Sequence, residues 1–188
     1  LRGQIRARRN TRTPSERRDA GIAIAAGLMP VVRERQSASV ACYFSLPTEP
    51  TTEPLIAQLW DSGVEVLTPR VRGNALEWIR SEPKSQYSDG SFGIREVSGG
   101  EPQPLAKVDL IFMPALAVSA SGTRLGQGGG FYDRALSALE LIPLLVAVLF
   151  ADEDNIDVPG QAHDVAVDAV ATDQGLRWIT TGASSRSK

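Results

Sequence analysis

The chain has 188 residues, of which 42% are hydrophobic and 22% charged, and its formal net charge is −2. These values are typical of a globular protein with one sizeable core, and they argue against a general polyanion binder. The single cysteine, Cys42, excludes an internal disulfide and a cysteine-based metal cluster. No apolar run reaches membrane-spanning length and no secretory signal is visible, so we expect a cytoplasmic protein that does not enter a membrane.

The N-terminal segment is rich in arginine, in contrast to the slightly acidic chain as a whole. Arg2, Arg6 and Arg9 are spaced so that they share one face of a helix predicted over residues 1–12. Taken alone, such a segment is typical of a solvated charged face, or of an arm that binds nucleic acid or a membrane surface.

A second helix is predicted to start at Thr13. Thr13 and Glu16 match a capping box, and Pro14 suits the first helical turn. Apolar residues then recur as far as Met29, and we expect Pro30 to interrupt the helical run because proline lacks the N–H that an α-helix needs.

The rest of the chain alternates between short apolar runs and helical segments. Strands are predicted at 39–45, 64–70, 76–79, 108–114, 144–150 and 177–180, and helices at 54–61 and 133–140. This alternation indicates an α/β fold, in which a largely parallel sheet is flanked by helices on both faces. We expect one domain over residues 1–180, a mobile tail over 181–188, and a turn-rich surface excursion without chemistry over 81–103.

The most informative stretch is a glycine-rich loop between a predicted strand and a predicted helix. Four of the five residues from Gly126 to Gly130 are glycine, with Arg124 before them and Asp133 after them. Glycine allows a backbone to turn its N–H groups toward a phosphate, arginine binds phosphate, and aspartate is a Mg²⁺ ligand. A flexible turn would have a similar composition, and neither the common P-loop nor the dinucleotide-binding glycine spacing is present.

Residues Arg124-Leu125-Gly126-Gln127-Gly128-Gly129-Gly130-Phe131-Tyr132-Asp133-Arg134 resemble the Arg-Leu-Gly-x-Gly-Gly-Gly-Tyr-Tyr-Asp-Arg motif of the 5-formyltetrahydrofolate cyclo-ligase family. Further segments resemble the family in the same order along the chain. They are Leu1-Arg2, Glu49-x-x-Thr52, Phe92-Gly93-Ile94 and His163-Asp164-Val165-x-x-Asp168. The family's ATP-binding lysine would fall before Leu1, outside this sequence.

The resemblance implies an ATP- and Mg²⁺-dependent enzyme that closes 5-formyltetrahydrofolate to 5,10-methenyltetrahydrofolate and releases ADP and phosphate. It implies ATP binding by Arg2, Arg6, Arg124, Leu125, Gly126, Gln127, Gly128, Gly129, Gly130, Phe131 and Tyr132, with Arg124 and Tyr132 in catalytic roles. For the folate it implies Gln127, Gly128, Gly129 and Phe131, together with two residues for which an alternative stays open. These are Glu49, which could equally be a solvent-facing loop acid, and Trp78, for which core packing is the alternative. The metal ligands implied are Asp133 and Asp168.

Two departures from the family pattern concern the lead-in to the glycine loop. Ala115 stands where the family has glycine and Ser119 where it has aspartate, and either change could weaken catalysis. The alternatives are a non-catalytic nucleotide or folate binder, and a nucleic-acid-binding module that uses the arginine arm. We expect a monomer that acts on a small molecule, without a nucleic-acid partner.

Overall fold

The computed structural model describes residues 1–90, 93–159 and 165–179. Its helices are α1 (Arg2–Thr11), α2 (Pro14–Glu34), α3 (Glu53–Asp61), α4 (Phe131–Ser137), and the short 3₁₀ turns η2 (Leu105–Lys107) and η3 (Ala151–Glu153). Its strands are β1 (Ser39–Ala41), β2 (Glu65–Arg72), β3 (Ala75–Ser81), β4 (Tyr87–Asp89), β5 (Arg95–Val97), β6 (Pro102–Gln103), β7 (Leu110–Pro114), β8 (Ala117–Val118), β9 (Arg124–Leu125), β10 (Leu144–Val148), β11 (Ala169–Thr172) and β12 (Gly175–Trp178).

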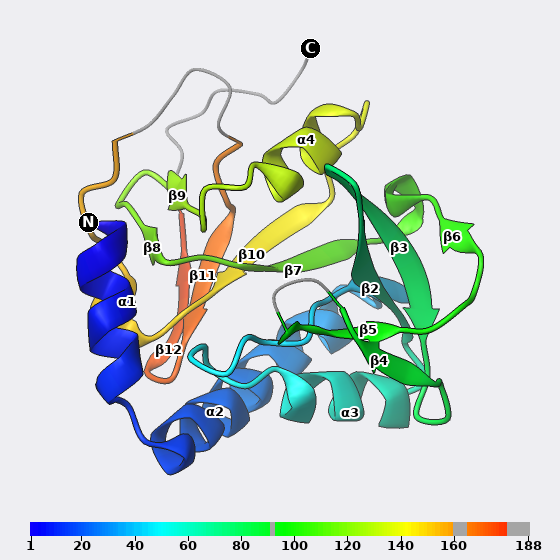
Figure 1. The fold of residues 1–188 in the computed structure, drawn as a ribbon, viewed down its shortest axis with the longest axis horizontal. Coiled ribbons are helices and arrows are strands. Elements are labelled where there is room, and N and C mark those ends of the chain that lie inside the picture. Colours follow the sequence, from blue (N-terminus) through cyan, green and yellow to red (C-terminus); the bar gives the residue numbers. More distant parts are fainter. Residues whose placement is uncertain (91–92, 160–164, 180–188) are drawn as a thin grey trace.

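An eight-stranded sheet crosses the molecule in the order β12-β11-β10-β7-β1-β2-β3-β6 (Figure 1). The pairs β11–β10, β10–β7, β7–β1 and β1–β2 are parallel, and antiparallel pairs occur only toward the two edges. The parallel centre follows from the runs of apolar residues in its strands, which are buried on both faces. The predicted α/β fold with a largely parallel sheet is confirmed.

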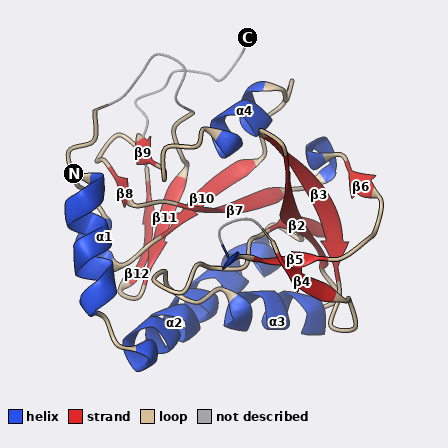
Figure 2. Cartoon of the chain, in the orientation of Figure 1, coloured by secondary structure: helices blue, strands red, loops and turns tan. Residues whose placement is uncertain are grey.

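Helices cover both faces of this sheet (Figure 2). On one face, α2 and α3 pack against alternate residues of the strands, such as Val40, Phe112 and Val146. On the other face, Leu136 of α4 packs with the intervening residues, such as Ile111 and Leu145. The two-residue alternation of a strand therefore divides the core into two layers. The described residues contain no helix with the length and apolar character of a bilayer crossing.

Helix α2 confirms the predicted N-terminal cap and corrects the prediction at Pro30. Thr13 accepts the backbone N–H of Glu16, and the Glu16 side chain accepts the backbone N–H of Thr13. The helix continues through Pro30 to Glu34 without interruption. The hydrogen bond that proline removes is offset by burial of Met29, Val31 and Val32 on either side of it.

The close contact of α2 with the loop before α3 depends on Gly21. A Cβ at Gly21 would lie 2.1 Å from the backbone oxygen of Thr51, whereas a Cβ at Gly27 in the same helix would meet nothing within 4 Å. We expect Gly21→Ala to lower the free energy of unfolding by roughly 1–3 kcal/mol, because one of the two backbones must move. Gly27→Ala is the matched control and should raise it by about 0.5–1 kcal/mol. Urea unfolding measures both, and equal effects would contradict this packing.

Three predicted features lie outside the described residues: the tail 181–188, the His163-Asp164 part of one family segment, and Phe92 of another. Within 81–103, β4 pairs with β5 in an antiparallel manner, with Tyr87 opposite Val97, and β6 forms an edge strand. Ile94 and Glu96 of this segment line the large cavity described below, and the absence of chemistry from the segment stays a prediction.

Candidate active site

A cavity of about 750 Å³ opens at the carboxyl ends of β7, β1 and β2. Ligands of open α/β sheets bind at this edge, where strand ends and the loops that follow them meet. The lining residues are Arg2, Arg6, Tyr43, Phe44, Leu46, Glu49, Pro69, Val71, Leu76, Ile94, Glu96, Pro114, Ala115, Arg124, Leu125, Gly126, Gln127, Gly128, Gly129, Gly130, Phe131, Tyr132, Asp133 and Pro159. The structure thus brings nearly all of the predicted site residues into one place.

The glycine loop presents its backbone to the cavity because side chains have no room or no suitable conformation there. Gly128 and Gly130 have φ angles of 104° and 65°, in the region that favours glycine. A Cβ at Gly126 would lie 2.9 Å from the Arg124 guanidinium, and one at Gly129 would lie 2.9 Å from the Phe131 ring. Helix α4 starts at Phe131, immediately after Gly130.

Arg124 holds the two ends of this loop together. Its side chain is 8% exposed. One Nη donates to the Asp133 carboxylate at 2.7 Å, and the other donates to the Pro114 carbonyl oxygen at 3.3 Å, at the end of β7. The Tyr132 ring centroid lies 5.8 Å from the guanidinium carbon. Arg124 is therefore fixed at the cavity wall with its positive charge only partly neutralised.

Helix α1 docks on the glycine loop through two arginines. Arg2 Nε donates to the Gly126 carbonyl oxygen at 3.0 Å. Arg6 donates to the Gln127 carbonyl oxygen at 3.0 Å and to the Gln127 side-chain oxygen at 2.9 and 3.1 Å. Both arginines line the cavity, so they add positive charge to the wall formed by the loop.

Below these contacts, α1 is anchored by a buried ionic network. Arg9 is 1% exposed and donates to both oxygens of Glu153, at 2.8 and 2.7 Å. The same guanidinium donates to the Ala115 carbonyl oxygen at 2.5 Å and approaches Glu49 at 3.4 Å. Burial lowers the pKa of Arg9, but the hydrogen bond and charge of Glu153 outweigh it and raise the pKa overall. The network holds Glu49 in the cavity wall.

Glu49 is a buried carboxylate that faces the cavity. It is 3% exposed and accepts the backbone N–H of Leu46 at 2.9 Å. Burial raises its pKa above the ordinary value of 4.5, and the nearby charge of Arg9 opposes that rise. A buried acid with one cationic neighbour at a cavity wall is suited to accept hydrogen bonds from a ligand.

Two predicted site residues do not line the cavity. Trp78 is 4% exposed and packs edge to face against Tyr132, with 5.9 Å between ring centroids, so its position supports the core-packing alternative. Asp168 precedes β11 and accepts the backbone N–H of Leu145 at the start of β10. Asp133 binds Arg124, which also binds the Pro114 carbonyl oxygen at the carboxyl end of β7. Asp133 therefore lies toward the opposite end of the parallel strands. The structure thus does not bring the two predicted Mg²⁺ ligands together at the cavity.

The two departures in the loop lead-in have structural roles. Ser119 Oγ accepts the backbone N–H of Thr123 at 3.0 Å and so closes the turn between β8 and β9. Serine thus supplies the oxygen acceptor that an aspartate side chain would offer at the same point. Ala115 is 3% exposed and its carbonyl oxygen binds Arg9. Both residues therefore make contacts that support the segment leading into the glycine loop.

Among the residues of the site that sequence reasoning missed, four have polar contacts or groups of interest: Arg9 as an anchor, Glu153, Tyr43 and Glu96. Glu96 is buried and accepts the backbone N–H of Val71 at 3.1 Å. Tyr43 could have been found, because it lies toward the carboxyl end of the strand predicted at 39–45, where ligand sites are built. Glu153 gave no comparable signal, since its partner is 144 residues away in sequence.

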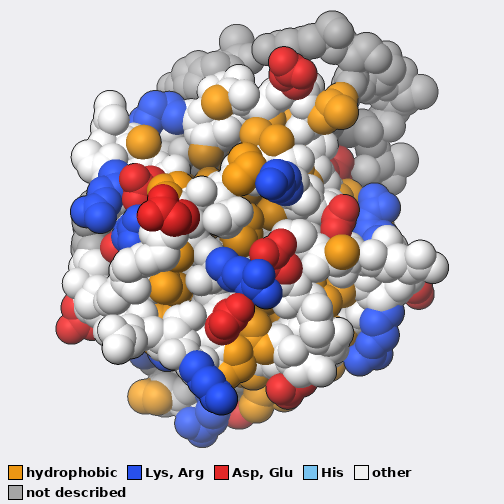
Figure 3. Space-filling view, turned by 90° about the vertical axis from the view of Figure 1, so that its right-hand side faces the viewer, with side chains coloured by type: hydrophobic (Ala, Val, Ile, Leu, Met, Phe, Trp, Pro, Cys, Tyr) orange, Lys and Arg blue, Asp and Glu red, His pale blue; other side chains and the backbone are white. Residues whose placement is uncertain are grey.

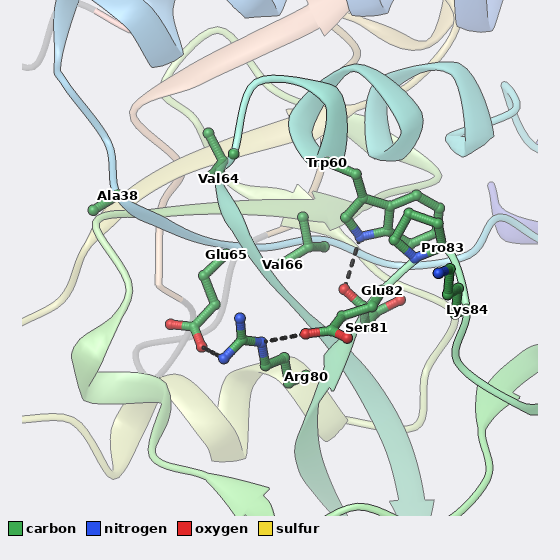
Figure 4. Close-up of a pocket in the computed structure, with 11 residues that line it drawn as sticks. Ala38, Trp60, Val64, Glu65, Val66, Arg80, Ser81, Glu82, Pro83 and Lys84 are labelled. Atoms are coloured by element: carbon green, nitrogen blue, oxygen red, sulfur yellow. Dashed lines mark hydrogen bonds and ion pairs between the residues drawn. The ribbon is translucent and has the colours of Figure 1, made fainter.

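A second, smaller hollow of about 370 Å³ lies at the opposite, amino-terminal end of β2 (Figure 4). Three of its four charged side chains bind one another: Arg80 pairs with Glu65 at 3.5 Å and with Glu82 at 2.9 Å. Trp60 Nε1 donates to the Ser81 carbonyl oxygen at 2.7 Å. These groups are satisfied within the protein, which distinguishes this hollow from the large cavity.

Fold and cavity together define an α/β protein with a glycine-lined, arginine-rich ligand site at the carboxyl edge of its parallel strands. Comparison with known proteins gives the family. The chain belongs to the 5-formyltetrahydrofolate cyclo-ligase family, whose model matches residues 1–173.

Individual relatives agree with this assignment. The chain is 35% identical over 146 residues to a 5-formyltetrahydrofolate cyclo-ligase of Mycolicibacterium smegmatis, covering 71% of this chain and 73% of that protein. It is 32% identical over 173 residues to that of Haemophilus influenzae, covering 88% and 91%. The solved structure of Aquifex aeolicus 5,10-methenyltetrahydrofolate synthetase superposes with a TM-score of 0.83 at 28% identity, covering 99% of this chain and 94% of that chain.

Proposed function

We propose that this protein converts 5-formyltetrahydrofolate to 5,10-methenyltetrahydrofolate, with consumption of ATP and release of ADP and phosphate. One observation carries the proposal beyond family membership. A single cavity combines a backbone loop and three arginines, suited to phosphate, with a buried carboxylate and an apolar wall, suited to a flat heterocycle.

The proposed reaction explains why the cavity needs positive charge and positioning but no side-chain nucleophile. The formyl oxygen attacks the γ-phosphorus of ATP and ADP leaves, so a poor leaving group becomes a phosphate ester. N10 of the folate then attacks the activated carbon, loses its proton, and phosphate departs with the former formyl oxygen. Phosphoryl transfer of this kind asks the protein mainly to align the reactants and to stabilise phosphate charge.

The ATP side of the proposal rests on the arginines and the glycine loop. Arg124 is fixed beside the loop, and Arg2 and Arg6 hold the loop from α1. Backbone N–H groups of Gly126–Gly130 would bind phosphate oxygens, with Leu125, Gln127, Phe131 and Tyr132 around them. In this arrangement Arg124 is the group that stabilises the transferring phosphoryl, and Tyr132 lies beside it.

The residues present fit a Mg²⁺ ion that arrives with the nucleotide. Among the described residues no group of three metal-ligating side chains occurs. Asp133 lines the cavity and engages Arg124 through Oδ1 only. Because Mg²⁺ in such sites is commonly held by one or two carboxylates together with substrate phosphates, Asp133 would be its protein ligand. Such an ion would neutralise phosphate charge during the transfer.

The folate side rests on Glu49. A carboxylate can accept two hydrogen bonds from adjacent N–H groups of a pterin-like ring, and Gln127, Gly128, Gly129 and Phe131 lie in the same cavity wall. Trp78 would act on this site only through its edge-to-face contact with Tyr132.

A pH dependence of folate binding follows from the burial of Glu49. Burial raises the pKa of this carboxyl above 4.5, and the ionised form is the one that accepts two hydrogen bonds. We therefore expect the Kd for 5-formyltetrahydrofolate to rise as the pH falls through that raised pKa, and to be constant above it. Calorimetric titration across this range tests the expectation. Glu49→Gln should bind more weakly and lose the pH dependence, and an unchanged profile in this variant would contradict the role of Glu49.

The arginine arm does not favour the nucleic-acid-binding alternative. Arg2, Arg6 and Arg9 contact the glycine loop or buried carboxylates, and Arg8 and Arg12 both pair with Asp152. On the face of the molecule drawn in Figure 3, basic and acidic side chains are interspersed.

Turnover distinguishes the proposed enzyme from a non-catalytic binder with the same cavity. The purified chain is incubated with 5-formyltetrahydrofolate, ATP and Mg²⁺, and the absorbance of the methenyl product is followed. We expect product only when ATP is present. Binding of both ligands without product would favour the non-catalytic alternative.

A further inference from the structure

Two tyrosines that line the large cavity have buried hydroxyls with no hydrogen-bond partner among the residues that the structure describes. They are Tyr43, which follows β1, and Tyr132 in α4. Burial raises the pKa of both, so each hydroxyl is a neutral donor at physiological pH. A buried polar group without a partner destabilises a folded protein, and its retention at a cavity wall indicates that a ligand supplies the missing bond.

The two hydroxyls share some neighbours. After burial itself, the influence that most raises the pKa of Tyr43 is the charge of Glu49, which also raises the pKa of Tyr132. Tyr132 also lies near Arg124, whose charge opposes the rise in its pKa. Tyr43 differs from Tyr132 in that it comes from the same segment as Glu49, the loop that leaves the carboxyl end of β1.

We propose that the Tyr43 hydroxyl determines specificity for the substrate's heterocycle by donating a hydrogen bond to its ring carbonyl oxygen. This inference rests on the proposed function. The pterin ring of a folate carries that carbonyl directly beside a ring N–H and an exocyclic amino group. A carboxylate such as Glu49 accepts from the two N–H groups, and a neighbouring hydroxyl donor is the complement that the carbonyl needs. A site built this way discriminates against ligands that lack one of the groups.

The test compares Tyr43→Phe with the unchanged protein in calorimetric binding of two ligands. We expect the Kd for 5-formyltetrahydrofolate to rise roughly 10-fold, because a single neutral hydrogen bond is lost. The Kd for ATP should change less than about twofold, because the lost hydrogen bond lies on the folate side of the cavity. The ligand-free variant should be at least as stable as the parent protein, because an unpartnered hydroxyl has been removed.

Tyr87→Phe is the matched control, since the Tyr87 hydroxyl already donates to the Glu82 carbonyl oxygen at 2.9 Å and does not line the cavity. It should leave the affinities for 5-formyltetrahydrofolate and ATP unchanged. Equal binding of 5-formyltetrahydrofolate by Tyr43→Phe and the parent would overturn the inference while leaving the proposed function intact, as would equal weakening for 5-formyltetrahydrofolate and ATP. Absence of folate binding by the parent protein would overturn both.

Discussion

Replacing Arg124 by alanine should lower kcat for ring closure by roughly 10²–10³-fold, the usual cost of removing one fixed donor from a charge-stabilising site. Arg124 is 8% exposed and is held by Asp133 and by the Pro114 carbonyl oxygen, so no other side chain can take its position without rearrangement. Arg124→Lys should recover only part of the loss, because lysine keeps the charge but not the planar fork. Steady-state kinetics of both variants measures the effect.

The control for Arg124 is Arg134→Ala. Arg134 follows the same loop, but its guanidinium donates to the Asn74 carbonyl oxygen and does not line the cavity. Its removal should change kcat only a few-fold. Thermal unfolding of each variant shows whether a loss of activity reflects a loss of folded protein. A fully active, folded Arg124→Ala enzyme would contradict the role given to this residue.

The largest expected effect on stability comes from Glu153. Its carboxylate is 0% exposed and binds Arg9 through both oxygens, so Glu153→Ala leaves a buried guanidinium without its main partner. The free energy of unfolding should fall by about 3–5 kcal/mol. The double variant Arg9→Met, Glu153→Leu should recover only part of that loss, because it removes this ion pair and keeps side-chain volume but leaves the buried Glu49 carboxylate without its cationic neighbour. Urea unfolding measures each variant.

Asp152 provides the matched control for this pair. It is the neighbouring acid and also pairs with α1, through Arg8 and Arg12, but its side chain is 42% exposed. Asp152→Ala should cost at most about 1 kcal/mol, as exposed ion pairs do. A loss for Glu153→Ala no larger than that for Asp152→Ala would show that the buried network does not stabilise the docking of α1.

The central strands and the glycine loop could be predicted from sequence because their signals are local. Apolar runs such as 108–114 and 144–150 predict buried parallel strands without knowledge of their partners. The glycines from Gly126 to Gly130 require a backbone that approaches its surroundings closely, whatever those surroundings are. Other cavity residues, such as Arg2, Arg6 and Glu49, were predicted only through the resemblance to the family.

The sequence-based predictions failed where contacts between distant parts of the chain determine the structure. Pro30 stays inside α2 because burial of its neighbours outweighs one lost hydrogen bond. Asp168 and Asp133 follow similar motif signals, but only the sheet topology shows that they lie at opposite ends of the parallel strands. The pairing of Arg9 with Glu153 joins residues with no relation in sequence. The cytoplasmic location and the monomeric state stay predictions.

The central claim, that this cavity transfers a phosphoryl group to the formyl oxygen before ring closure, is tested most directly by isotope labelling. 5-Formyltetrahydrofolate with ¹⁸O in the formyl group is turned over with unlabelled ATP and Mg²⁺, and the released phosphate is examined by mass spectrometry. We expect one ¹⁸O atom in each phosphate formed with the methenyl product. Methenyl product accompanied by unlabelled phosphate would contradict the account.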